Sequence, residues 1–265
     1  MLEIKNLTIT SKTTTLVENL TITIDLGQWF ALVGESGSGK SLTASAIGGL
    51  LPDHLEIKSG FIRVGNHEPL TMKKRELSRL LGNDIAYIFQ DYNGAFTPFL
   101  TIGAQLEEVL KAHTKWPRAE RRKAVQEGLR KVKLPEKVYQ SYPLQLSGGQ
   151  LQRAAIASAM LLNPSLLIAD EPTTALDGLT AHHILHLIHE LAAECAVLFI
   201  THDLRLVKKY ATEIGVLKEG TLVETGPKEV LFTTPKHSYT NMLLRSIPDL
   251  KNAPERLIAC EYDAL

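Results

Sequence analysis

A glycine-rich stretch between an apolar strand and a helical run sets the strongest limit on how this 265-residue chain can fold. Residues 34–41 read Gly-Glu-Ser-Gly-Ser-Gly-Lys-Ser, which matches the phosphate-loop pattern G-x-x-x-x-G-K-[ST]. The stretch follows the apolar run Trp29–Val33 and opens the helical run Leu42–Gly48. Small residues let backbone N–H groups wrap a phosphate, and the helix N-terminus adds partial positive charge. The pattern therefore predicts a nucleotide-binding α/β core rather than a simple glycine-rich turn.

The residues of this loop have separate expected tasks. Lys40 supplies a point charge to the β- and γ-phosphates of a nucleotide such as ATP, and the Ser41 hydroxyl is suited to ligate Mg²⁺. The residues expected to hold the phosphates are Gly34, Glu35, Ser36, Gly37, Ser38, Gly39, Lys40 and Ser41.

Two carboxylates follow a second apolar run, Leu166–Ala169. Asp170 lies at the expected strand tip and suits Mg²⁺, which keeps several waters and takes few protein carboxylates. Glu171 is then the candidate to orient and polarise an attacking water. An apolar strand that ends in Asp-Glu is also common before a solvated turn, so the prediction of function depends on the phosphate loop.

Polar residues follow two further strands. His202 comes after the run Ala196–Ile200, and Gln90 comes after Ile85–Phe89. Each alone is more typical of a structural residue. Open α/β sheets bind ligands outside the carboxyl ends of their parallel strands, where both residues and the loop are expected to meet. We therefore expect Gln90 and His202 to lie in the ligand site together with Glu171, the candidate base, and with Ser41 and Asp170, the candidate metal ligands.

The alternation of apolar runs and helical patterns predicts the fold class. Runs that are apolar throughout are typical of parallel strands buried on both faces. We expect an α/β phosphate-loop core with a mostly parallel sheet, an antiparallel β part near the N-terminus and an inserted helical subdomain. The core spans 1–100 and 163–220, the helical subdomain 101–162 and a C-terminal tail 221–265. The expected strands are Leu2–Ile9, Thr21–Ile24, Trp29–Val33, Ile85–Phe89, Leu166–Ala169, Ala196–Ile200 and Ile214–Leu217.

Composition limits the other classes of function. The formal net charge is zero, so there is no bulk basic footprint for nucleic acid. No apolar run approaches the roughly 20 residues that cross a bilayer, and the start lacks a secretory signal pattern. The two cysteines, Cys195 and Cys260, are far apart and favour a reducing compartment. We expect a protein on the cytoplasmic face of a membrane at most, with other subunits supplying the membrane part.

A pentapeptide upstream of the paired carboxylates carries a family resemblance. Residues 146–150 read Leu-Ser-Gly-Gly-Gln, identical to the signature motif of ABC ATPases. The order of the phosphate loop, Gln90, the signature, Asp170-Glu171, Ala175-Leu176-Asp177 and His202 also resembles the order in that family. The resemblance covers essentially the whole chain.

The resemblance implies a mechanism that needs two subunits. ABC ATPases pair head to tail, with each nucleotide between one phosphate loop and the partner's signature motif. Ser147, Gly149 and Gln150 would thus bind the γ-phosphate held by the partner, which agrees with the helical run that follows at Leu151–Leu162. Asp177 would join the two sites across the interface. Gln90 would sense Mg²⁺ and the attacking water, and His202 would contact the γ-phosphate, so the resemblance implies a catalytic role for both and a metal contact for Gln90.

A narrower resemblance concerns the cargo. Residues 90–98, and the stretches 226–232 and 235–240, are similar to oligopeptide, dipeptide and nickel importers. Peptide-importer members often carry a cysteine-rich extension, whereas this sequence ends soon after Cys260, which favours nickel or a metal chelate. The implied partners are a paralogous second ATPase, two permeases and an extracytoplasmic substrate-binding protein, with no nucleic acid. An ABC exporter subunit or a non-transport ABC ATPase are the alternatives.

One departure from the family concerns the base of the nucleotide. Family members usually place an aromatic residue near the end of the first strand, where it stacks on adenine, but residues 10–15 contain no ring. We expect modest ATP affinity and poor base discrimination.

Two tempting features have plainer interpretations. His182, His186 and His189 share one face of a predicted helix, opposite an apolar stripe, so solvent exposure is favoured over a metal site. The basic run between Arg118 and Lys133 contains Glu120 and Glu127 and no aromatic residues, so a solvated helix surface is favoured over a nucleic-acid groove. Cys195 precedes an apolar strand and is expected in the core.

Overall fold

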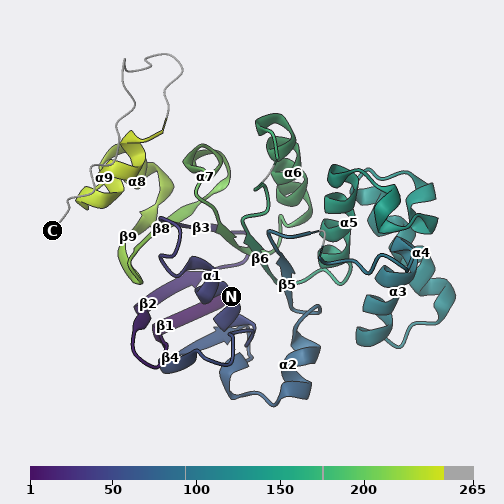
Figure 1. Cartoon of the computed structure of the whole chain (residues 1–265), viewed down its shortest axis with the longest axis horizontal. Helices are drawn as coiled ribbons and strands as arrows, with labels where there is room; N and C mark the ends of the chain where they lie inside the picture. The colour runs from purple at the N-terminus through teal and green to yellow at the C-terminus, as the bar shows by residue number, and fades with distance from the viewer. Residues whose placement is uncertain (93, 175, 248–265) are drawn as a thin grey trace.

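The computed structural model of this chain describes residues 1–92, 94–174 and 176–247. Within these ranges nine strands form one mixed sheet, ordered β4-β1-β2-β9-β8-β3-β7-β6-β5. The strands are β1 (Leu2–Thr10), β2 (Thr15–Ile24), β3 (Trp29–Val33), β4 (Glu56–Val64), β5 (Ile85–Ile88), β6 (Leu166–Asp170), β7 (Ala196–Ile200), β8 (Glu213–Lys218) and β9 (Thr221–Pro227). Figure 1 shows the sheet in the middle of the molecule, between two groups of helices.

The helices lie both over the faces of this sheet and beyond its edges. They are α1 (Lys40–Ile47), α2 (Lys74–Leu80), α3 (Ile102–His113), α4 (Arg118–Lys131), α5 (Gly148–Met160), α6 (Gly178–Leu191), α7 (Leu204–Tyr210), α8 (Lys228–Thr233) and α9 (Ser238–Arg245). In Figure 1, α3, α4 and α5 lie together beyond β5, while α8 and α9 lie beside β9. None of the helices in the described ranges has the length and apolarity needed to cross a membrane.

The parallel half of the sheet is buried on both faces, as its apolar runs predict. β3 pairs in parallel with β7 and β8, and β6 pairs in parallel with β5 and β7. Alternate residues of β6 enter different cores: Leu167 and Ala169 on one face, Leu166 and Ile168 on the other. Because side chains alternate along a strand, a strand covered on both sides must be apolar throughout.

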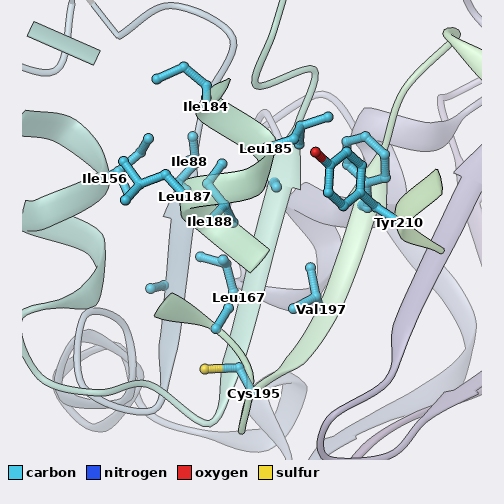
Figure 2. Close-up of a cluster of buried hydrophobic side chains, with 14 of the residues drawn as sticks. Ile88, Ile156, Leu167, Ile184, Leu185, Leu187, Ile188, Cys195, Val197 and Tyr210 are labelled. Atoms are coloured by element: carbon cyan, nitrogen blue, oxygen red, sulfur yellow. The ribbon is translucent and has the colours of Figure 1, made fainter. Parts of the chain in front are cut away.

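Helix α6 covers one face of the parallel strands. Its buried residues Ile184, Leu185 and Ile188 recur at helical spacing, and Figure 2 shows them in a cluster with Leu167 and Val197. Burying each such side chain contributes about 1.5–3 kcal/mol to folding. Cys195 lies in the same core, as predicted, with its Sγ 2.9 Å from the carbonyl oxygen of Pro164, and burial raises the pKa of its thiol.

The antiparallel part near the N-terminus confirms the expected fold class but corrects the expected strands. β1 pairs antiparallel with both β2 and β4. β2 begins at Thr15, six residues earlier than predicted, and β4 was not predicted at all. Only Ile62 and Val64 of β4 are buried, so this edge strand lacks the apolar pattern that reveals the others.

Residues 101–162 are described in full and contain helices and turns but no strand, as expected. Two prolines mark the starts of elements in this part of the chain. Pro117 precedes the first residue of α4, and Pro135 precedes a short 3₁₀ turn, Glu136–Gln140. The fixed φ of proline suits the start of a helix but not its interior.

After β8 the chain forms β9, α8 and α9, all within the stretch 221–265 that was expected to form a C-terminal tail. β9 pairs antiparallel with β8 and touches β2 through Glu18 and Thr221. Cys260 and the rest of 248–265 lie outside the described residues, as do Asn93 and Ala175.

Candidate nucleotide site

The phosphate loop turns tightly between β3 and α1. Gly39 has a φ of 105°, and a Cβ built on it would lie 2.8 Å from Val17 Cγ2. A Cβ on Gly34 would lie 2.1 Å from the carbonyl oxygen of Leu217. Side chains at these two positions would displace the loop, so glycine is required there for the close approach to β2 and β8.

Lys40, the first residue of α1, reaches back across the loop. Its Nζ donates to the carbonyl oxygens of Gly34 (2.8 Å) and Glu35 (2.7 Å), and the residue is only 7% exposed. Burial lowers the pKa of the Lys40 ammonium, against the opposing pull of Glu171 and other carboxylates. A positive charge held in this way suits an anionic ligand in the loop.

Asp170 and Ser41 meet across the site. Asp170 ends β6, and its Oδ1 accepts a hydrogen bond of 3.2 Å from the hydroxyl of Ser41 in α1. Burial raises the pKa of the Asp170 carboxyl, and the hydrogen bond from Ser41 opposes that shift. A carboxylate and a hydroxyl side by side form an oxygen-donor set of the kind that Mg²⁺ accepts.

Glu171 is held on both of its carboxylate oxygens. Oε1 lies 2.8 Å from His202 Nδ1, and Oε2 accepts a 2.8 Å hydrogen bond from the hydroxyl of Thr174. The backbone of Glu171 has a φ of 50°, which non-glycine residues rarely adopt. Thr174 was missed by the sequence analysis, although a threonine three residues after the carboxylate in a Pro-Thr-Thr turn was an available signal.

One cavity of about 510 Å³ brings half of the predicted residues together. It contains loop residues, Gln90 from beyond β5, and the pair of Glu171 and His202 from beyond β6 and β7. The full lining is Ser36, Gly37, Gly39, Lys40, Ser41, Leu42, Gln90, Glu171, Thr174 and His202. The carboxyl ends of parallel strands meet here, as expected from the sheet type.

The signature residues are not part of that cavity. Ser147 precedes α5, and its Oγ accepts a hydrogen bond from Gln150 N (3.4 Å). In return Gln150 Oε1 accepts from Ser147 N (3.0 Å), which completes a capping box. Gly148 and Gly149 begin α5, so the N-terminus of this helix is presented at the surface.

Asp177 is also outside the cavity and caps a different helix. Its Oδ1 accepts from the backbone N–H groups of Leu179 (3.1 Å) and Thr180 (3.0 Å) at the start of α6. Hydrogen bonds from the Thr180 side chain and backbone hold the pKa of Asp177 below its usual range. Within one chain, this carboxylate therefore stabilises a helix end.

The turn between β1 and β2 lies beside the loop. A Cβ on Gly39 would contact both Leu16 and Val17 of β2. The connecting residues are Ser11, Lys12, Thr13 and Thr14, none of them aromatic. The expected stretch is therefore next to the phosphate loop, and it offers no ring to a base.

The histidines of α6 correct one expectation. His182 is half-buried rather than solvated. The Tyr210 hydroxyl donates a hydrogen bond of 3.2 Å to the His182 carbonyl oxygen. Packing of the His182 ring against the Tyr210 ring of α7, with ring centres 5.9 Å apart, explains the difference. His186, which pairs with Glu190 at 3.5 Å, and His189, whose ring lies 5.2 Å from that of Trp29, are exposed as expected. Among the described residues, no group of three or more histidine, cysteine or acidic side chains could hold a metal ion.

The basic run has local partners in α3, α4 and the turn after α4. Arg121 donates to the carbonyl oxygen of Trp116 at 2.6 Å, and the Arg122 guanidinium lies 5.2 Å from the centre of the Tyr139 ring. These contacts are typical of a solvated helix surface.

Family models match two parts of the chain. The model described as "ABC transporter" matches residues 17–174, and the model described as "Oligopeptide/dipeptide transporter, C-terminal region" matches residues 223–261. The first match contains the loop, the signature and the paired carboxylates. The second begins within β9 and contains α8 and α9.

Curated relatives match nearly the whole chain. It is 40% identical to the metal-staphylopine import system ATP-binding protein CntD of Staphylococcus aureus, over 92% of both chains. It is 38% identical to the dipeptide transport ATP-binding protein DppD of Lactococcus lactis, over 98% of this chain and 77% of the relative. The oligopeptide transport ATP-binding protein OppD of Bacillus subtilis is also 38% identical, over 96% and 74%.

A solved structure shares the fold. The ATP-binding cassette MJ0796, a dimer bound to ADP and Pi in a post-hydrolysis state, matches with a TM-score of 0.75 and 31% identity. The match covers 86% of this chain and 99% of that one.

Proposed function

This chain belongs to the ABC transporter family of ATP-hydrolysing subunits, and on that premise we propose that it powers import of a peptide or a metal chelate through separate permeases. The single observation that carries the ATPase part is the cavity that unites the phosphate loop with Glu171 and His202. The C-terminal match, together with relatives named for dipeptide, oligopeptide and metal-staphylopine transport, supports import over export.

The phosphates of ATP would occupy the loop. Binding them would draw the Lys40 ammonium away from the carbonyl oxygens of Gly34 and Glu35 and toward the β- and γ-phosphates. The backbone N–H groups of residues 34–41 and the N-terminus of α1 would supply the other contacts.

Ser41 and Asp170 fit a Mg²⁺ ion, because their oxygens already lie 3.2 Å apart at the edge of the same cavity. Gln90, which lines that cavity, would be the third group near the ion. When bound, Mg²⁺ neutralises charge on the β- and γ-phosphates. Burial raises the pKa of the Asp170 carboxyl, as expected for a carboxyl that is removed from water and would gain a cation only with the nucleotide.

Glu171 would orient the attacking water and accept its proton. Thr174 and His202 fix its two oxygens, so the carboxylate cannot rotate freely away from the loop. His202 is 69% exposed in its side chain, which leaves its Nε2 edge free to contact a γ-phosphate. Thr174 and His202 would thus contribute to the rate by holding Glu171 in place before ATP arrives.

The site would be completed by a second subunit. Ser147, Gly149 and Gln150 lie at the exposed N-terminus of α5 and away from the cavity of their own chain. A helix N-terminus is a ready anion site, so it would bind the γ-phosphate held by a partner. Asp177, next to the start of α6, would join the two halves. The dimeric state of MJ0796 supports this pairing.

The remaining parts follow from the same proposal. Residues 1–100 and 163–220 would act as the ATPase core, 101–162 as the helical subdomain and 221–265 as the tail. We propose a paralogous second ATPase, two permeases and an extracytoplasmic binding protein as partners, with this subunit on the cytoplasmic face of the membrane.

Reconstitution tests the import proposal. The chain, its paralogue and the permeases encoded beside it would be placed in liposomes with the cognate binding protein. ATP hydrolysis should rise when that protein carries a di- or oligopeptide, or a nickel or metal–chelate complex. If each of these classes leaves both hydrolysis and uptake at the basal rate, the importer proposal is wrong.

A further inference from the structure

A tyrosine from the C-terminal region touches the phosphate loop. Tyr239, in the first turn of α9, accepts a 3.1 Å hydrogen bond on its hydroxyl from the backbone N–H of Glu35. The two residues are 204 positions apart in the chain. Tyr239 is only 4% exposed, whereas Glu35 is exposed, so this contact is partly buried.

Several groups fix the position of that ring. Glu224 of β9 accepts the backbone N–H groups of Lys236 (2.8 Å) and His237 (3.0 Å), immediately before α9. The His237 ring accepts the N–H of Tyr239 at 3.2 Å, which caps the helix. The Lys218 ammonium, at the end of β8, lies 5.3 Å from the ring centre. The start of α9 and the Tyr239 ring are thus held by contacts from β8, β9 and the residue before α9.

Glu35 is held from opposite sides. Its N–H donates to Tyr239, and its carbonyl oxygen accepts from Lys40 at 2.7 Å. The preceding residue, Gly34, is packed so closely on Leu217 that it allows no side chain. The first peptide units of the loop therefore have little freedom to shift, and the contact from α9 is the one that comes from outside the ATPase core.

We propose that Tyr239 is a positioning residue for ATP binding, through which the C-terminal region holds the phosphate loop in its binding conformation. This inference rests on the proposed function of the loop. An apparent dissociation constant rises in proportion as the competent conformation becomes less populated. Loss of the hydroxyl therefore raises the KM for ATP. It leaves kcat nearly unchanged, because Glu171 and His202 are on other strands.

The variant Tyr239→Phe removes the hydroxyl and keeps the ring. One such hydrogen bond corresponds to about a three- to tenfold change in an equilibrium. We expect the KM for ATP, and the dissociation constant of a fluorescent ATP analogue, to rise by that factor in the full chain with its partner ATPase. The kcat should stay within about twofold.

Tyr210→Phe is the matched control. Tyr210 is 6% exposed and its hydroxyl also bonds a backbone group, the carbonyl oxygen of His182, far from the loop. Its loss should lower the melting temperature to a similar degree and leave the KM unchanged. Glu224→Gln, which weakens the anchor before α9, should raise the KM in the same direction and covers the case in which Tyr239→Phe does not fold.

The outcomes separate this inference from the proposed function. If the wild-type protein does not hydrolyse ATP, the proposed function fails. If the wild type is active and Lys40→Ala is inactive, but Tyr239→Phe and Glu224→Gln keep the wild-type KM, only the positioning role is wrong. An equal rise in KM for Tyr210→Phe would also overturn it, because the effect would then be one of general stability.

Discussion

Individual side chains in this site are held in place before any nucleotide arrives. Lys40 is paired with two carbonyl oxygens of the loop, and Glu171 is bonded by both Thr174 and His202. Glu171 therefore keeps its direction at no further entropic cost when the phosphates bind, whereas Lys40 would exchange two carbonyl oxygens for phosphate oxygens. The pKa shifts of Lys40 and Asp170 have the same cause, because burial disfavours the charged form of both.

Replacing Glu171 by Gln should separate binding from hydrolysis. The amide keeps the size of the side chain but cannot accept a proton, so kcat should fall by about 10²- to 10⁴-fold while ATP binding is retained. Release of phosphate and equilibrium binding of an ATP analogue measure the two effects. Lys40→Ala is the comparison, since it should weaken both. Hydrolysis by Glu171→Gln at the wild-type rate would show that another group acts as the base.

Selectivity for the base of the nucleotide should be poor because of the residues in the turn between β1 and β2. The turn beside Gly39 carries threonine, serine and lysine instead of a ring, and stacking on a ring contributes about 1–3 kcal/mol per base in other proteins. Affinities of the isolated subunit for ATP and GTP should therefore lie within about tenfold of each other. Competition binding measures the ratio, and a tight curve with strong preference for ATP would contradict the expectation.

At the scale of elements, the ends of helices supply most of the site. α1 begins in the phosphate loop, α5 begins at the signature and α6 begins at Asp177. Ser147 and Asp177 each cap their own helix through side-chain oxygens. Such a cap contributes about 1 kcal/mol to stability, so these residues have a structural role even in a single subunit.

The two roles of Ser147 can be separated with an acidic cap. Ser147→Asp preserves the cap, because aspartate and serine cap helices equally well, but it turns a negative charge toward the partner's γ-phosphate. We expect an unchanged melting temperature and a loss of ATPase activity of about a hundredfold, the scale of one lost donor to developing charge. Ser147→Ala should instead lose about 1 kcal/mol of stability. Normal activity in Ser147→Asp would exclude a γ-phosphate contact at this helix.

At the scale of the whole molecule, different elements cover the two faces of the sheet. The helical face contains α6 and its neighbours, and the other face contains α1 and the antiparallel strands β1, β2 and β4. Trapping this sheet between two cores leaves the carboxyl ends of β3, β6 and β7 as the place where a ligand can reach it. The signature helix α5 starts outside that cavity, so on the proposed mechanism one chain would contribute half of each of two sites.

Assembly should therefore depend on ATP. With Glu171→Gln to prevent hydrolysis, mixing this chain with its paralogue and Mg-ATP should produce a dimer in sedimentation, and omission of ATP should leave monomers. ATP would bridge the loop of one subunit and the signature of the other. The Ser147→Asp variant is the control and should stay monomeric. A dimer of equal stability without nucleotide would argue against a shared γ-phosphate.

The sequence by itself determined the parts whose chemistry is local. The phosphate loop, the strand that ends in Asp170 and Glu171, and the prolines that divide the helical part are each visible within a few residues, because backbone geometry and burial on two faces dictate those residue types. The tertiary structure alone decided what distant residues do to one another. β4 is too exposed to show an apolar pattern. The hydrogen bond from Thr174 to Glu171 depends on the fold of the turn after β6. Tyr239 reaches Glu35 only because β8, β9 and α9 pack beside the loop. Contacts across 204 residues depend on how elements pack, and no local periodicity records that packing.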